Sequence, residues 1–196
     1  MPSNTTASTQ PRTVTSAVDR GKLDIKALVL LAILIAAGFI LNFTVGKSVY
    51  ALTAGAIGPE FIISAFCITI LAVRPNIAQA LVMGLISAAV IQLTTSSPFI
   101  DFAAEGIAAM VMALIVNAGM RTPAAKFIPL IATFVTTVLS GLIFMVIKLA
   151  VMGFAPEVLS VLPAAMIPVI FATAAFNAVL VAVLYPSIRR ALKLAD

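Results

Sequence analysis

Charged side chains are sparse across the central part of this chain. Between Lys26 and Arg189 lie 162 residues, and only nine of them are charged. The uncharged intervals include residues 27–46, 127–147 and 158–188. A helix needs about 20 mostly apolar residues to cross the hydrocarbon core of a bilayer, which is about 30 Å thick. Each of these intervals is long enough, so the spacing of charges predicts an integral membrane protein.

The composition of the chain favours helices as the spanning structure. Apolar residues make up 62% of the sequence, against about 45–50% in ordinary soluble proteins, and the mean hydropathy is +1.20. Inside a bilayer every backbone N–H and C=O group needs a partner, so only helices and closed barrels cross it. Barrel strands alternate apolar and polar residues, whereas the apolar runs of this chain are continuous. We therefore predict an all-α integral membrane protein.

Apolar runs separated by polar or proline-containing breaks predict six transmembrane helices. Glycines between Gly46 and Pro59 predict a flexible loop after the first helix. Pro168 predicts a break in the last helix, which we expect to end near Tyr185 and Pro186. The expected spans are residues 27–45, 60–73, 77–93, 102–118, 125–152 and 163–192.

The first 22 residues differ in composition from the rest of the chain. They are rich in serine and threonine and contain almost no large apolar side chains. Such a segment cannot bury enough apolar surface to order itself. We expect residues 1–22 to form a disordered cytoplasmic tail and residues 23–196 to form one six-helix transmembrane domain.

Lysine and arginine are distributed unevenly between the two expected sides of the membrane. Ten of them fall on the side of the two termini, and two, Lys47 and Lys148, fall on the other side. Cytoplasmic loops of membrane proteins carry an excess of positive charge. Both termini are therefore expected in the cytoplasm.

Several classes of chemistry lack their usual residues in this chain. It has one cysteine, Cys67, and no histidine, so neither an intramolecular disulfide nor a Cys/His metal site is expected. It contains no GxxxxGK[ST] phosphate-binding loop, no HExxH motif and no CxxC motif. We expect no enzymatic activity, no cofactor, no bound metal ion and no nucleic-acid partner.

Two charged residues near the outer side are the first candidates for ligand binding. Glu105 lies near the start of the fourth span, with Asp101 one helical turn before it. Lys148 follows Lys126 by 22 residues, about 33 Å along a helix, which puts it near the outer boundary. Carboxylates at membrane depth usually face a cavity or a partner, and an acid and a base at one mouth would suit a zwitterion. The alternatives are a solvated acid at a helix start and a lysine that reaches the lipid headgroups.

Small polar residues in or between the spans are further candidates. Thr94 and Thr95 begin a run of four hydroxyl residues, which either lines a ligand mouth or forms an exposed loop. Asn42 and Asn177 either contact a ligand or form hydrogen bonds across helices.

Two alanines four residues apart, Ala32 and Ala36, lie on one face of the first expected helix. Small residues at this spacing allow another helix to approach closely. The face that they form is suited either to a partner protein or to packing within the domain.

Short motifs at consistent spacing give the chain a resemblance to a known family. Over roughly residues 25–192 the sequence resembles bacterial tryptophan transporters, which look like the substrate-binding S components of energy-coupling-factor (ECF) transporters. The motifs are Gly84-Leu85-Ile86-Ser87, Leu93-Thr94-Thr95 before Pro98, Leu139-Ser140-Gly141-Leu142-Ile143-Phe144 before Gly153, and Asn177 eight residues before Tyr185-Pro186.

The resemblance implies an S-component-like fold of six helices in a bacterial inner or plasma membrane. It implies a ligand pocket near the outer face, beneath the loop that follows the first helix. It also implies that Ala32 and Ala36 dock a transmembrane coupling protein, which works with two cytoplasmic ATPases. The lack of a phosphate-binding loop in this chain fits such a division of labour.

The function that the resemblance implies is capture of an aromatic amino acid from the outer face for uptake, with tryptophan as the first candidate. Glu105 is expected to bind the ammonium group of this ligand. Lys148, or the hydroxyl groups of Thr94 and Thr95, is expected to bind its carboxylate.

Four further residues complete the expected site. Asn42 and Asn177 are expected to orient the ligand, and Phe99 or Phe102 to pack against it. Three other functions remain open. They are a vitamin or vitamin precursor as the ligand of the same fold, a proton-coupled secondary transporter that acts alone, and a structural protein without a ligand.

Overall fold

The structure is a computed structural model that describes residues 25–95 and 97–192. The described residues contain helices and no strand, which confirms the all-α class. The tail predicted at residues 1–22 lies outside them. In chain order the elements are α1 (Ile25–Leu41), the π-helical segment η1 (Asn42–Gly46), α2 (Lys47–Leu52), α3 (Phe61–Val73), α4 (Ile77–Ile91), α5 (Ile100–Gly119), the 3-10 segment η2 (Ala125–Phe127), α6 (Ile128–Val151) and α7 (Pro156–Ala191).

Four helical stretches of the described chain are long and apolar enough to cross a membrane. α3 and α4, with 13 and 15 residues, are apolar but shorter than the roughly 20 residues that a span requires. The lengths of these four stretches agree with the membrane protein that the charge spacing predicts. The number of spans, six, and the cytoplasmic side of the termini stay predictions. The four long stretches are Ile25–Leu52, Ile100–Gly119, Ala125–Val151 and Pro156–Ala191.

The first helix is longer than predicted because Gly46 does not end it. The chain passes from α1 through η1 into α2 and leaves the helix after Leu52. Gly46 itself has helical backbone angles and is buried. A single glycine costs a helix only about 1 kcal/mol relative to alanine, and the apolar residues on both sides keep the helix favoured. The loop expected from Gly46 onward is therefore confined to residues 53–60.

The last helix, α7, is unbroken and begins earlier than predicted. It starts at Pro156 rather than Pro163 and continues through Pro168 and Pro186 to Ala191. The break expected near Pro168 and the cap expected near Pro186 are therefore wrong, whereas the expected last residue of the span, Leu192, directly follows the observed end of the helix. Each internal proline removes one backbone hydrogen bond, but α7 packs along α6 over much of its length. This packing supports the helix across the weakened turns.

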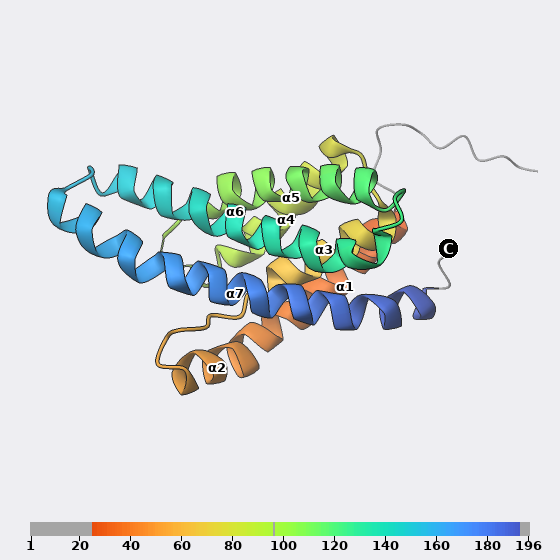
Figure 1. The fold of residues 1–196 in the computed structure, drawn as a ribbon, viewed down its shortest axis with the longest axis horizontal. Coiled ribbons are helices and arrows are strands. Elements are labelled where there is room, and N and C mark those ends of the chain that lie inside the picture. The colour runs from red at the N-terminus through yellow and green to blue at the C-terminus, as the bar shows by residue number, and fades with distance from the viewer. Residues whose placement is uncertain (1–24, 96, 193–196) are drawn as a thin grey trace, which may run out of the picture.

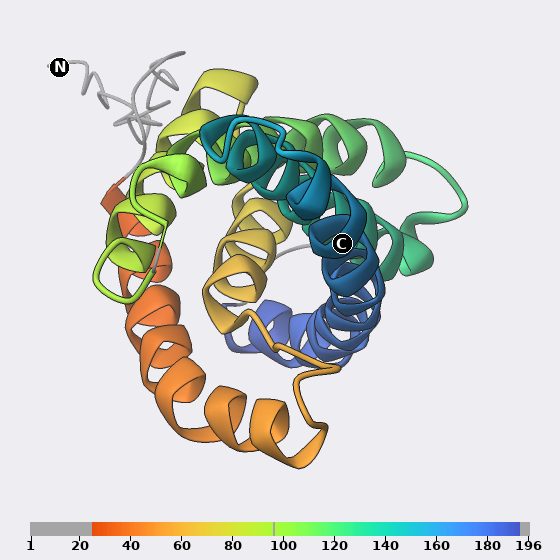
Figure 2. The same ribbon diagram turned by 90° about the vertical axis from the view of Figure 1, so that its left-hand side faces the viewer.

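The short helix α3 lies inside the bundle, and other helices surround it (Figure 2). Every residue from Phe61 to Leu71 is buried, and the helix contacts α1, α4, α5, α6 and α7. The Tyr185 hydroxyl of α7 donates a hydrogen bond to the carbonyl of Leu71 at 3.3 Å. Arg74 ends the helix in the left-handed conformation (φ 51°), directly before Pro75. A helix that is apolar on all sides is expected to be buried in this way.

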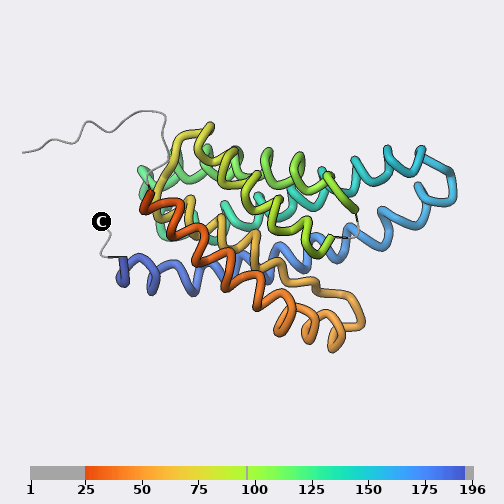
Figure 3. The backbone as a smooth tube through the Cα atoms, turned by 180° about the vertical axis from the view of Figure 1, so that it is seen from behind, coloured from red at the N-terminus to blue at the C-terminus, as the bar shows by residue number. Residues whose placement is uncertain are grey.

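The connections between helices gather at two opposite ends of the bundle (Figures 1 and 3). One end holds the start of α1, the α3–α4 and α5–α6 connections and the end of α7. The other end holds the α2–α3 loop, the α4–α5 turn and the α6–α7 turn. Arg74, Arg121 and Lys126 belong to connections of the first end, and Arg189 and Arg190 to the last turn of α7. Basic residues therefore concentrate at one end.

α4 and α5 are in close contact at Gly84. A Cβ atom at this position would lie 2.5 Å from the carbonyl oxygen of Glu105 and 2.8 Å from the Cβ atom of Ala109. Neither neighbour can move aside without a shift of the α5 backbone. The missing side chain at Gly84 therefore sets the distance between the two helices beside Glu105.

We predict that Gly84→Ala destabilises the protein and that Gly46→Ala does not. A methyl group at position 84 would push α4 away from α5, and such overpacking typically costs about 1–3 kcal/mol. At Gly46 an added Cβ would meet its nearest atoms at 3.5 Å, which is ordinary contact, and alanine favours the helix. Thermal unfolding in detergent, followed by circular dichroism, measures both variants. A Gly84→Ala variant as stable as the unchanged protein would contradict this account of the α4–α5 contact.

Candidate functional site

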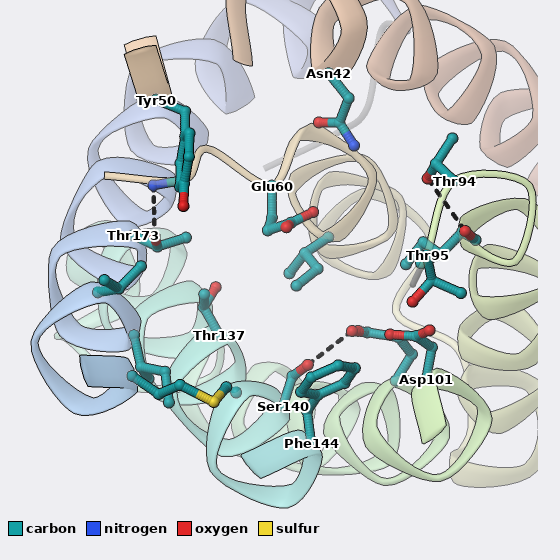
Figure 4. Close-up of a pocket in the computed structure, with 18 of the residues that line it drawn as sticks. Asn42, Tyr50, Glu60, Thr94, Thr95, Asp101, Thr137, Ser140, Phe144 and Thr173 are labelled. Carbon is teal, nitrogen blue, oxygen red and sulfur yellow. Dashed lines mark hydrogen bonds between the residues drawn. The ribbon is translucent and has the colours of Figure 1, made fainter. Parts of the chain in front are cut away.

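A cavity of about 600 Å³ lies among the helices at the end that holds the α2–α3 loop and the α4–α5 turn (Figure 4). Its lining comes from η1, α2, the α2–α3 loop, α3, α4, the α4–α5 turn, α5, α6 and α7. Segments distant in the sequence therefore meet around one space, which is typical of a small-molecule site.

Three carboxyl groups line the cavity, those of Glu60, Asp101 and Glu105. Glu60 directly precedes α3, Asp101 is in the first turn of α5, and Glu105 follows one turn later. Of the described residues that line the cavity, none is a lysine or an arginine. No group of three or more His, Cys, Asp or Glu side chains in the described chain is arranged to hold a metal ion.

Glu105, predicted to bind an ammonium group, is almost fully buried at the cavity wall, with 3% of its surface exposed. Its Oε1 atom accepts a hydrogen bond of 2.7 Å from the Ser140 hydroxyl of α6. Its Oε2 atom has no hydrogen-bond partner. A buried polar atom without a partner destabilises the folded state by about 1–3 kcal/mol, and by more where the group is charged. A ligand that donates a hydrogen bond inside the cavity would remove this cost.

Gln92 connects Asp101 to the α4–α5 turn. Its Nε2 atom donates a hydrogen bond to Asp101 Oδ2 at 3.1 Å, and its Oε1 atom accepts one from the backbone N–H of Phe99 at 2.9 Å. Thr94 and Thr95, both predicted site residues, belong to this turn and line the cavity. One side chain therefore holds both the acid and the turn at the cavity.

Glu60 is held in place through the backbone, by residues of η1 and α7. Asn177 Oδ1 accepts a hydrogen bond from the N–H of Glu60 at 3.3 Å, and Asn42 Oδ1 accepts one from the N–H of Phe61 at 2.9 Å. Thr173 Oγ1 accepts a third from the N–H of Gly58 at 3.1 Å. The two amides predicted to orient a ligand thus orient the start of α3. Asn42 also lines the cavity, whereas Asn177 is fully buried outside its lining.

A row of α6 side chains forms one wall of the cavity. Thr137, Ser140 and Phe144 line it and follow one another at helical spacing. Thr137 is 3% exposed, and its hydroxyl has no hydrogen-bond partner. Sequence reasoning alone does not assign Thr137 to the site. The signal that could have found it is a polar stripe at intervals of three and four residues on an otherwise apolar helix.

The aromatic residues of the cavity differ from those predicted. Tyr50 and Phe144 line it, as Figure 4 shows. Phe99 and Phe102 are not among the lining residues, and the Phe99 side chain is 77% exposed. Phe99 has a left-handed backbone (φ 68°) at the start of α5, a local conformation that the sequence pattern does not reveal. Tyr50 and Phe144 are therefore the aromatic residues that the structure places at the cavity.

Lys148 is near the cavity but does not line it. Its Nζ atom lies 5.6 Å from the centroid of the Phe144 ring, one helical turn earlier on α6, which is a cation–π contact. The structure therefore does not bring Lys148 and Glu105 together across one mouth, because the lysine lies against the ring of Phe144 instead. A zwitterionic ligand in this cavity would therefore have acids near its ammonium group but no lysine among the described lining residues near its carboxylate.

Ala32 and Ala36 are both exposed on α1. They therefore do not pack inside the bundle, which was the alternative to a partner surface. Exposed residues on an apolar helix of this length can face lipid or another protein.

No protein-family model, no curated protein and no solved structure matches this chain. The resemblance to bacterial tryptophan transporters and to S components thus stays a prediction from short motifs. What supports a function is the chemistry of the cavity, which combines three acids, unpaired polar atoms and two aromatic rings.

Proposed function

We propose that this protein is the substrate-binding membrane subunit of an importer, and that its cavity captures a small molecule that carries an ammonium group and an aromatic body. The observation that carries this proposal is Glu105, whose buried carboxyl group lines the cavity with one oxygen unpartnered. An aromatic amino acid is the first ligand to test, tryptophan before others, in line with the resemblance of the sequence.

The size and the lining of the cavity support a ligand of this kind. Small-molecule sites commonly enclose about 300–1,000 Å³ and combine apolar walls with a few polar groups. Here Ile63, Met166 and Ile170 supply apolar surface, and Tyr50 and Phe144 supply aromatic surface. The apolar and aromatic walls suit the indole ring of tryptophan, and the acids beside them suit its ammonium group.

The distribution of charge supports capture from outside the cell. The cavity lies toward the end with the α2–α3 loop, and the basic connections with Arg74, Arg121 and Lys126 lie at the opposite end (Figure 3). If those basic residues face the cytoplasm, as positive charges of membrane proteins usually do, the cavity faces outward.

Partner proteins would supply the energy for transport. The sequence contains no phosphate-binding loop of the GxxxxGK[ST] type. In our proposal a transmembrane coupling protein docks on the α1 face that carries Ala32 and Ala36, and two cytoplasmic ATPases act through it. The exposure of both alanines is compatible with such a contact.

We predict that purified protein in detergent binds tryptophan, with a Kd on the order of micromolar, and that Glu105→Gln weakens binding at least about tenfold. The substitution keeps the shape of the side chain but removes the charge that pairs with the ammonium group, and hydrogen bonds to charged groups contribute about 1.5–3 kcal/mol. Isothermal titration calorimetry measures both proteins. Unchanged affinity in the variant would exclude Glu105 from the site.

Glu157→Gln is the matched control for this titration. Glu157 is an exposed carboxylate at the start of α7 that does not line the cavity. Its loss should leave the affinity unchanged. Vitamins and their precursors, titrated in the same assay, test the alternative ligand class.

We predict that the double substitution Ala32→Trp and Ala36→Trp abolishes uptake in cells that contain the partner proteins while ligand binding stays intact. Both positions are exposed, so bulky side chains fit without disturbing the bundle and block only an external contact. Radiolabelled uptake and calorimetry measure the two effects separately. Ala175→Trp, at an exposed alanine of α7, is the control that should affect neither.

Uptake by the protein alone would contradict the proposed partners. Vesicles that contain only this protein, with no ATP, should not accumulate the ligand under a proton gradient. Accumulation there would favour a secondary transporter that acts without ATPases.

A further inference from the structure

We infer that the natural ligand is an organic cation that carries an ammonium group and lacks a carboxylate, rather than a zwitterionic amino acid. This inference rests on the proposed function, because it names the substrate class of the same cavity. It follows from the charges around the cavity, from the polar atoms that lack partners, and from the state of the helix ends that face it.

The lining offers acids for a positive group, and for a negative group it offers only neutral donors, among them the hydroxyls of Thr94 and Thr95. Glu60, Asp101 and Glu105 line the cavity, and no lysine or arginine does so among the described residues. The carboxylate of an amino acid would lie within the same space as its ammonium group, beside three acids and with no lysine or arginine among the described lining residues to pair with it. A charged group left without a partner disfavours a ligand, which is one way in which a site selects against it.

Lys148 cannot readily supply the missing positive charge. Its ammonium group already contacts the ring of Phe144, at 5.6 Å from the ring centroid, and its side chain is outside the lining. Lys47 is likewise placed over the ring of Phe43, at 4.3 Å. Neither lysine is among the described residues that line the cavity.

Helix N-termini are the other groups that commonly bind a carboxylate, and two of them lie at this cavity. At the start of α3, the N–H groups of Glu60 and Phe61 are already bound by the amide oxygens of Asn177 and Asn42. At the start of α5, Asp101 occupies the first turn. Each helix end therefore has an acid of the chain beside it, which disfavours a second anion there.

Unpaired polar atoms in the lining independently indicate a bound ligand. Glu105 Oε2 and Thr137 Oγ1 have no hydrogen-bond partner, although each residue is only 3% exposed. They belong to two different helices, α5 and α6, that face the same cavity. An ammonium group has three donors and no acceptor, so it suits the free carboxyl oxygen of Glu105. Buried polar atoms are normally satisfied, and a polar ligand in the cavity accounts for both unpaired atoms.

Three indole compounds test the inference, because they share the ring and differ only in charge. Tryptamine carries the ammonium group alone, tryptophan carries both groups, and indole-3-propionate carries the carboxylate alone. Titrated into the purified full-length protein by calorimetry, tryptamine should bind at least about tenfold more tightly than tryptophan. Indole-3-propionate should show no binding.

Each outcome of the three titrations has one meaning. Tryptophan binding as tightly as tryptamine, or more tightly, overturns the inference and leaves the proposed function standing. Binding of indole-3-propionate alone overturns both, because the acids would then not select the ligand. Absence of heat and of thermal stabilisation with all three compounds also counts against both.

A set of variants tests whether the acids cause the expected preference for tryptamine over tryptophan. Glu105→Gln should weaken tryptamine binding at least about tenfold and reduce its advantage over tryptophan, because one of the groups that repel the carboxylate is gone. Glu157→Gln should change neither affinity. If Glu105→Gln does not fold, Glu60→Gln carries the same test, since Glu60 lines the cavity but is only half-buried. An unchanged ratio of the two affinities in every folded variant would refute the role of the acids.

Discussion

The first turn of α3 begins between neighbouring helices, with Phe61 buried and Glu60 half-buried at the cavity. The first backbone N–H groups of a helix have no partner within it, so other groups must supply acceptors. The amide oxygens of Asn42 and Asn177 bind the N–H groups of Phe61 and Glu60, and they come from η1 and α7 on either side. The position of the innermost helix and the position of one acid at the cavity therefore depend on the same two side chains. A change in either amide would affect packing and ligand binding together.

The deepest acid of the cavity depends on helix packing in a similar way. Glu105 is on α5, and its backbone carbonyl lies against Gly84 of α4, where a Cβ atom would not fit. On its other side, Ser140 of α6 binds one carboxyl oxygen. Three helices thus enclose a carboxyl group that they satisfy only in part. Such incomplete satisfaction is costly in an apolar interior, and a function that uses the free oxygen accounts for its presence.

Sequence reasoning predicts those features that depend on local composition and misses those that depend on three-dimensional packing. The apolar runs mark every long helix, but Gly46 and Pro168 do not interrupt theirs. A single glycine costs a helix little, and α7, which contains Pro168, packs along α6. Glu105 and Thr95, predicted as site residues because charged or polar groups are costly in apolar surroundings, line the cavity. Phe99 does not line it, because its backbone is left-handed at the start of α5, which its residue type does not reveal.

The length of α7 has a consequence for how the protein sits in a bilayer. Its 36 residues span about 54 Å, and even a tilt of about 40° leaves a height of roughly 41 Å, which exceeds a hydrocarbon core of about 30 Å. Part of α7 must therefore stand in the headgroup layer or beyond it. In Figures 1 and 3 the α6–α7 turn projects past the other connections, and it carries Met152 and Phe154 on its surface. Apolar side chains at that height favour the boundary between lipid and water, where they would anchor the cavity end at a constant depth.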